Sequence, residues 1–249
     1  MKTILIFILL TSLAIKASDI PEKPKPFRLD IENALAWQSY NRNQIPNTTL
    51  GTKFDLTNFV SGARYAPRLY FSYFFNEKHS LRALIFPFQA EGTGISAEEI
   101  KFNGQTFAPG QSLKAKYRFH SYRLSYRYQF FENENWELKV GFTAKIRNAN
   151  VALSQGEIST NYSNWGFVPL LYFNAKYFLS PNWRLEFDMD ALAAPQGRAE
   201  DISIQAWHGF NPSWELGLGY RTLEGRADNS RVSTFTWLHF LILSTSLRF

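Results

Sequence analysis

Two small groups of side chains in this sequence could support hydrolytic chemistry. Asp188 and Asp190 are separated by one residue, and Asp201 follows a short distance along the chain. Carboxylates near a histidine can act as general acids and bases. His120 stands next to Ser121, and such a pair can supply a base and a nucleophile. Neither group forms a complete set of nucleophile, base and orienting residue. We therefore predict that the protein is not an enzyme, with hydrolytic activity kept as an alternative.

Other chemistries have less support. The chain has no Cys, which excludes thiol catalysis and disulfide bonds. It contains neither a metal-ligand spacing nor a phosphate-binding glycine loop, so we expect no metal and no cofactor. The formal net charge is +6 at pH 7. Because its basic residues alternate with apolar ones instead of forming a patch, we expect no nucleic-acid partner.

Most of the chain alternates apolar and polar residues. In the segment 136–148, WELKVGFTAKIRN, the even positions up to Ile146 are apolar and most odd positions are charged. A period of two predicts a β-strand with one apolar face. Similar stretches predict ten strands, at 27–42, 64–75, 80–89, 114–130, 136–148, 167–178, 183–192, 201–210, 214–222 and 235–249. A break in the alternation near Ser121 suggests a β-bulge.

The connections between these strands alternate strictly in length. The short ones are 76–79, 132–135, 180–182 and 211–213, and the long ones are 43–63, 90–113, 148–166, 193–200 and 223–234. An up-and-down barrel with short turns at one end gives this pattern, whereas a sandwich with Greek-key crossovers does not. Asn103-Gly104 predicts a type I′ hairpin that extends the strands 80–89 and 114–130. A twelve-stranded barrel is the alternative.

Aromatic residues recur at fixed places in this pattern. Trp136, Trp183 and Trp214 each begin a strand directly after a short turn. Amphipathic rings prefer the interface between lipid and water, so we expect these residues at a membrane interface. The apolar face of each strand would then contact lipid, and the charged face would line the lumen.

The two ends of the chain fit this class. Residues 1–17 read as a cleavable signal peptide, followed by a short Pro-rich periplasmic tail at 18–26. The last strand ends on Phe249, which resembles the assembly signal of Gram-negative outer-membrane β-barrels. Together with the alternating loops and the aromatic residues, it gives residues 27–249 a resemblance to that class. The resemblance implies an all-β transmembrane antiparallel up-and-down barrel in the outer membrane. Its implied partners are membrane lipid and the barrel-assembly machinery, which would bind the C-terminal strand.

The predicted lumen is strongly charged. The expected lumen-lining residues are Arg28, Asp30, Glu32, Arg123, Arg127, Glu137, Lys139, Lys145, Arg147, Lys176, Arg184, Glu186, Asp188, Asp190, Glu215 and Arg221, together with Arg118, His120 and Arg248. Buried charges need partners, and a barrel of this size has little space beyond its side chains. The predicted role is therefore structural or a porin-like path for small solutes.

Two alternatives remain open. One is a surface protein that binds through its loops. The other is an outer-membrane enzyme. Omptin proteases share the ten-strand count and use Asp and His near the outer rim, which would direct attention to Asp188, Asp190 and Asp201. Lipid-modifying barrels carry a catalytic pair that faces lipid. His120 is the only His predicted to face inward, because His79 lies in a short turn and His208 and His239 have lipid-facing positions.

Overall fold

The computed structural model describes residues 25–195 and 197–249. The predicted signal peptide at 1–17 and most of the tail predicted at 18–26 lie outside the described residues. No helix within the described ranges is long and apolar enough to cross a bilayer.

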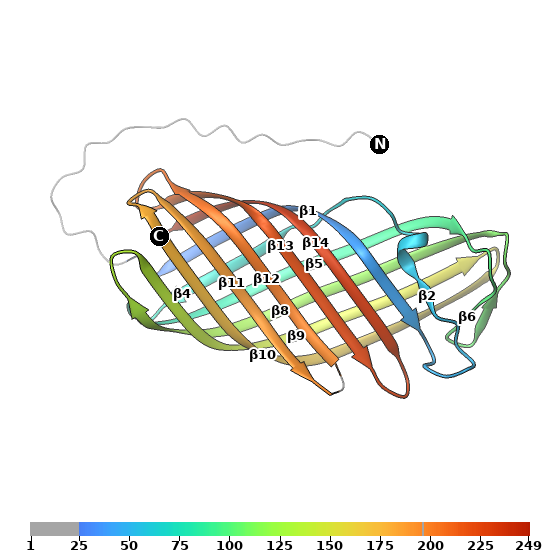
Figure 1. Ribbon diagram of the computed structural model, residues 1–249. Coiled ribbons are helices and arrows are strands. Elements are labelled where there is room, and N and C mark those ends of the chain that lie inside the picture. The colour runs from blue at the N-terminus through green and yellow to red at the C-terminus, as the bar shows by residue number, and fades with distance from the viewer. Residues whose placement is uncertain (1–24, 196) are drawn as a thin grey trace.

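The chain forms a closed antiparallel barrel of ten long strands (Figure 1). These strands are β1 (Phe27–Gln44), β4 (Arg68–Phe74), β5 (His79–Ile95), β8 (Ser112–Glu132), β9 (Trp136–Gln155), β10 (Ile158–Ser180), β11 (Trp183–Ala194), β12 (Gly197–Gly209), β13 (Trp214–Asp228) and β14 (Ser233–Arg248). Each pairs with its neighbour, and β1 pairs with β14 from Arg28↔Arg248 to Gln44↔Ser233, which closes the barrel. The predicted all-β class and strand number are confirmed.

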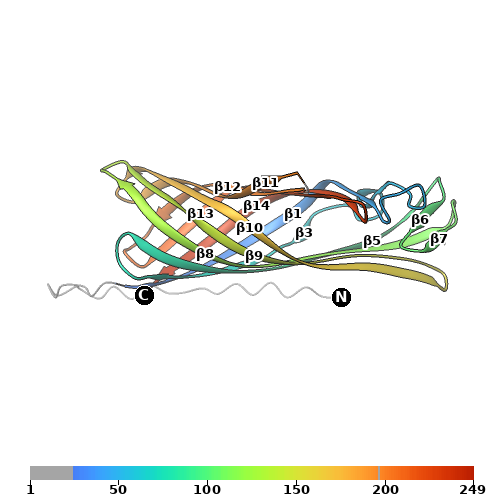
Figure 2. The ribbon, with the colours of Figure 1, turned by 90° about the horizontal axis from the view of Figure 1, so that it is seen from below.

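The two ends of the barrel differ. Phe27 and Phe249 exchange backbone hydrogen bonds at one end, here called the terminal end. At the opposite, distal end, β5, β8, β9 and β10 extend well beyond β11 and β12 (Figures 1 and 2). Several short elements gather at this end: β2 (Phe54–Asp55), the 3₁₀ helix η1 (Leu56–Asn58), β6 (Ile100–Phe102) and β7 (Gln105–Phe107). The short strand β3 (Arg64–Tyr65) instead pairs with the middle of β1, at Leu35 and Ala36.

The predicted Asn103-Gly104 hairpin is present but differs in its pairing. Asn103 has φ 46° and Gly104 has φ 81°, as a type I′ turn requires. However, β6 and β7 form a separate two-stranded sheet and do not extend β5 and β8. The hairpin packs against the distal end instead, where the Asn103 side chain donates to the backbone carbonyl of Asn161 at 2.9 Å.

The prediction of long distal loops is wrong at 148–166, because β9 and β10 continue to a tight turn at Gly156, which has φ 56°. The segments 193–200 and 223–234 likewise consist mostly of strand. Polar and apolar residues still alternate in these segments, but here the apolar residues face inward and the polar residues face outward. Val151 and Leu153 point inward and are buried, while the outward positions carry polar residues such as Asn150. A strand prediction based on apolar outward faces therefore ends these strands too early.

The bulge predicted near Ser121 is also wrong. β8 pairs without a register shift from Ser112 to Gln129, and its irregularity falls between Gln129 and Phe131. What changes at Ser121 is the chemistry of the two faces. On the terminal side the inward residues are charged or polar, and on the distal side they are aromatic or aliphatic. Arg118 and His120 consequently face outward, which corrects their predicted place in the lumen.

The outward face of the terminal half is apolar. Its exposed large side chains include Ile31, Leu35, Leu69, Phe71, Ile85, Leu124, Phe142, Leu171, Leu185, Ile204, Leu218, Leu241 and Leu243. Water penalises such a continuous apolar surface, whereas lipid accommodates it. The barrel thus has a charged interior and an apolar exterior at the same level.

An arginine on this exterior tests the assignment to lipid. We expect Leu124→Arg to lower the free energy of unfolding in lipid vesicles by about 2–4 kcal/mol, because its charge would lie near the bilayer midplane. Leu124 is 52 % exposed, so the same change on a soluble protein would cost little. Ile95→Arg at the distal end is the matched control, with little change expected. Urea titration of both variants provides the comparison, and equal effects would contradict a lipid-facing Leu124.

Candidate functional site

The centre of the lumen contains a carboxylate that is shared by three arginines. The two Asp201 oxygens lie 2.8 Å from Arg68 Nη1, 2.5 Å from Arg123 Nη2 and 2.6 Å from Arg221 Nη1. Arg221 also contacts Glu32 at 2.9 Å. These residues come from five different strands, so the network crosses the lumen and joins opposite walls.

A second group continues this layer. Arg82 binds both oxygens of Asp188 at 3.0 Å, and the Tyr172 hydroxyl donates to the same carboxylate at 2.7 Å. Asp190 accepts from Arg123 at 2.8 Å and from the Thr143 hydroxyl at 2.6 Å. The aspartates considered for acid–base chemistry are therefore held by basic and hydroxyl groups.

A third group lies nearer the terminal end. Glu137 is 2.7 Å from the ammonium groups of both Lys139 and Lys176. Arg184 pairs with Glu186 and Glu215, and Arg28 pairs with Asp30 at 2.7 Å. Nearly all of these charges are shielded from water, and in such surroundings a charge is tolerated only when it is paired and hydrogen-bonded.

An apolar layer covers the charged network on its distal side. Phe86 is fully buried, with its ring centroid 5.8 Å from those of Phe88 and Phe240. The guanidinium carbon of Arg68 lies 4.2 Å from the Phe86 ring centroid and 5.0 Å from that of Phe240. These cation–π contacts join the two layers. Leu238 and Ile242 are also fully buried in this layer.

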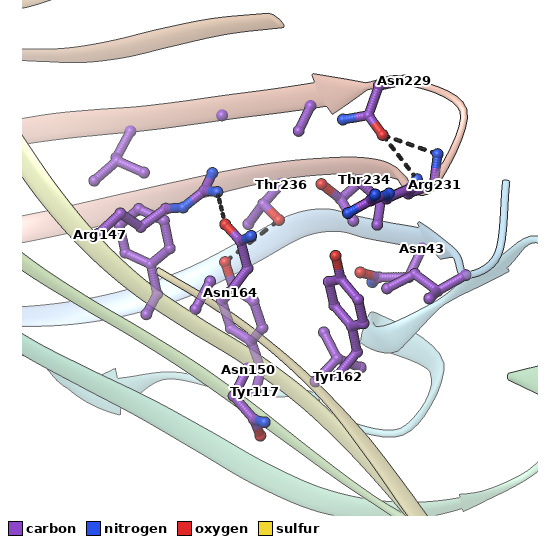
Figure 3. A pocket seen from close by; sticks show the side chains of 18 residues that line it. Asn43, Tyr117, Arg147, Asn150, Tyr162, Asn164, Asn229, Arg231, Thr234 and Thr236 are labelled. Carbon is purple, nitrogen blue, oxygen red and sulfur yellow. Dashed lines mark hydrogen bonds between the residues drawn. The ribbon is translucent and has the colours of Figure 1, made fainter. Parts of the chain in front are cut away.

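The space inside the barrel is divided by these layers. A vestibule of about 1020 Å³ opens at the terminal end, lined among others by Lys139, Lys176 and Arg248. Within the charged layer there is a separate cavity of only about 30 Å³. A third cavity of about 280 Å³ lies at the distal end, and Phe119 and Leu223 belong both to its lining and to the apolar core (Figure 3).

The distal cavity has a mixed lining, shown in Figure 3. Its polar side chains include Asn43, Tyr117, Arg147, Tyr162, Asn164, Asn229, Arg231, Thr234 and Thr236. None of the described residues that line it is acidic. Arg147 donates from Nη2 to Asn164 Oδ1 at 2.7 Å, while its buried Nε has no hydrogen-bond partner. The cavity therefore offers hydrogen-bond donors, aromatic rings and positive charge.

The structure places all sixteen lumen-lining residues named above, from Arg28 to Arg221, on inward positions, with Arg147 at the distal cavity. Trp136, Trp183, Trp214 and Phe249 are exposed on the exterior at the terminal end. Their location at a membrane interface stays a prediction.

Sequence reasoning missed Arg68, Arg82 and Asp201 as lumen residues. The alternation does indicate Arg68, because it directly precedes the outward-facing Leu69 and adjacent strand residues face opposite sides. Arg82 was also visible, as the single charge in an otherwise apolar strand. The distal cavity was missed because most of its wall was assigned to loops.

The four His residues all face away from the lumen. His120 lies on the outward face of β8, and His79, His208 and His239 contact exterior aromatic rings. No Asp–His pair therefore exists within the described lumen, and the His120–Ser121 pair is separated because Ser121 faces inward. Across the described residues, no group of three or more His, Cys, Asp or Glu is placed to hold a metal ion.

No family model matches the chain, and no curated protein matches its sequence. Among solved structures, the chain is similar to the outer-membrane protease OmpT from Escherichia coli, with a TM-score of 0.59 and 9% identity over 91% of this chain and 98% of that chain. The transport unit of the autotransporter AIDA-I from Escherichia coli gives a TM-score of 0.48 at 9% identity, covering 94% and 93%. The attachment invasion locus protein Ail of Yersinia pestis gives 0.42 at 12% identity, covering 90% and 99%.

The chain therefore has the fold of the Gram-negative outer-membrane β-barrels. This fold, together with the apolar exterior, supports an outer-membrane location with the barrel embedded in lipid.

Proposed function

We propose that the protein is an outer-membrane binding protein whose closed barrel supports a ligand cavity at the distal, cell-exterior end. The observation that carries this proposal is the filled lumen directly beneath the cavity. The charged network and the apolar layer separate the distal cavity from the terminal vestibule. A ligand that enters from the distal end would stop there. This role corresponds to the surface-binding alternative, with strands and a short hairpin in place of long loops.

The lining of the cavity indicates the class of ligand. The lining contains Arg147 and Arg231 but no acidic residue, which favours an anion. Asn and Thr side chains suit hydroxyl groups, and the Tyr117 and Tyr162 rings suit an apolar face. A sugar acid combines all three properties. We therefore propose a small anionic carbohydrate as the ligand class.

Single-channel recording tests the closed barrel against the porin-like alternative. The protein is folded in detergent, checked by heat-dependent gel migration and inserted into a planar bilayer. We expect no discrete current steps. The feature that favours a solute path is the terminal vestibule, whose lining holds more basic than acidic residues. Steady anion-selective steps would support that path and contradict the closed scaffold.

Calorimetric titration with glucuronate, compared with glucose, tests the ligand class. We expect glucuronate to bind more tightly than glucose. The Arg147→Met substitution should weaken glucuronate binding at least about 10-fold, as expected for loss of a charge-assisted hydrogen bond. Arg118→Met is the matched control, because Arg118 donates to Asn148 on the neighbouring strand but faces outward. No glucuronate binding by folded protein, or equal losses in both variants, would exclude this ligand.

A further inference from the structure

His239 on the exterior of β14 contacts a hydroxyl group with each of its ring nitrogens. Its Nε2 is hydrogen-bonded to Ser39 Oγ, and its Nδ1 is hydrogen-bonded to Tyr220 Oη. Ser39 belongs to β1 and Tyr220 to β13, the two strands that flank β14 in the closed barrel. The closure of the barrel thus brings together three residues that are far apart in sequence.

An irregularity in β1 positions the serine. The register runs from Gln38↔Leu238 directly to Tyr40↔Trp237, so Ser39 has no partner on β14. A bulge of this kind re-aims a side chain. Here Ser39 is exposed on the same exterior face as Trp37.

Two indole rings hold the imidazole in place. The Trp37 ring centroid lies 5.6 Å from that of His239 at an interplanar angle of 23°, and the Trp237 centroid lies 5.0 Å away. A proton on Nδ1 that is donated to the Tyr220 hydroxyl leaves Nε2 as an acceptor for Ser39. The contact with Tyr220 is compatible with this tautomer, which is the one that a general base needs at Nε2.

The height of this group on the barrel matches a bilayer interface. β14 rises by about 20 Å along the axis between Leu247, which pairs with Trp214, and His239, at about 3.4 Å per residue and a strand tilt of about 40°. The apolar band of a barrel is about 25 Å tall and is flanked by aromatic residues. His239 and its Trp neighbours therefore lie near the distal edge of that band, where acyl-chain ester groups meet water.

We propose that Ser39 and His239 form an ester-hydrolysing site that acts on acyl esters of membrane lipids, with Tyr220 as a positioning residue. Ser39 Oγ attacks the ester carbonyl carbon while its proton passes to His239 Nε2. The ester C–O bond breaks, the leaving alcohol takes that proton, and an acyl–Ser39 ester remains. Water then attacks this ester with His239 as base, which releases the fatty acid and restores Ser39.

His79 provides a matched comparison on the same exterior. Its Nδ1 is 2.6 Å from the Tyr126 hydroxyl, and its ring lies 5.1 Å from that of Tyr128. In the described structure its hydrogen bonds include no serine hydroxyl. His79→Ala thus removes an exterior His and its Tyr contact without altering the proposed nucleophile.

The test uses the full chain folded in mixed micelles with phosphatidylethanolamine that carries a labelled acyl chain. We expect release of labelled fatty acid, a loss of at least about 100-fold in Ser39→Ala and His239→Ala, and less than twofold change in His79→Ala. Tyr220→Phe should lower kcat more than it raises KM and should shift the pH–rate profile. Heat-dependent gel migration establishes that each variant is folded.

A second measurement is independent of the variants. A fluorophosphonate probe should attach to Ser39 of the wild-type chain, as located by peptide mass spectrometry, and His239→Ala should abolish the attachment. Folded wild-type protein that neither releases fatty acid nor takes up the probe would overturn the proposal. Release that persists in folded Ser39→Ala would also overturn it.

Discussion

Replacing Asp201 by Asn is expected to lower the free energy of unfolding by about 3–5 kcal/mol, since removal of one partner leaves buried charges uncompensated. The carboxylate of Asp201 accepts from three guanidinium groups within 2.8 Å, and Arg68 has no exposed side-chain surface. The neutral amide keeps the shape of the side chain but loses its charge. Arg68 and Arg123 would then have Glu32 and Asp190 as their remaining acidic partners.

Urea unfolding in lipid vesicles, followed by Trp fluorescence, measures this effect. Asp228→Asn is the control, because Asp228 pairs with Arg226 at the distal rim, where both side chains are exposed. Exposed ion pairs contribute little, so we expect almost no change in that variant. If the two substitutions shift the urea midpoint equally, the central network does not stabilise the barrel in the way inferred here.

Removing the aromatic rings above this network is expected to destabilise the barrel and to open it. Phe86→Ala should cost about 3–5 kcal/mol, because a fully buried Phe leaves a cavity when it is truncated. Phe86→Ala combined with Phe240→Ala would remove both rings that lie over Arg68. We expect this double variant to show intermittent current steps in a planar bilayer that the wild-type protein lacks.

Phe142→Ala is the matched control for the double variant. Phe142 is 68 % exposed on the exterior, so its removal leaves the lumen unchanged. Current steps in the Phe142 variant would mean that conductance arises from general loosening of the barrel. A folded but silent double variant would show that the charged network closes the lumen without help from the apolar layer.

The alternation of side chains was sufficient to predict the ten strands and most of the inward charges, because period two directly reports the two faces of a strand. It was insufficient where the surroundings of the strand change. On β8, the residues on both sides of Ser121 keep their parity while the inward side chains change from Arg123 to Phe119. In the sequence, this change moves the apolar residues from even to odd positions, and a β-bulge would produce the same pattern.

Contacts between residues far apart in the sequence were a second feature that could not be predicted. Ser39 carries no local signal, since its orientation depends on an irregular pairing with β14. Its contact with His239 joins residues 200 positions apart. Likewise, the distal cavity is built mostly from segments that were assigned to loops, because their polar outward faces do not resemble lipid-facing strands.

The change of chemistry along β8 has a consequence for how the barrel sits in the membrane. Below Ser121 the exterior carries Tyr122, Leu124 and Tyr126, and above it the exterior carries Arg118 and Lys116. Movement of the barrel towards the terminal side would pull these basic groups into hydrocarbon, and movement the other way would expose apolar rings to water. The alternation that builds the wall therefore also fixes its insertion depth, and with it the distance that the distal cavity stands above the lipid surface.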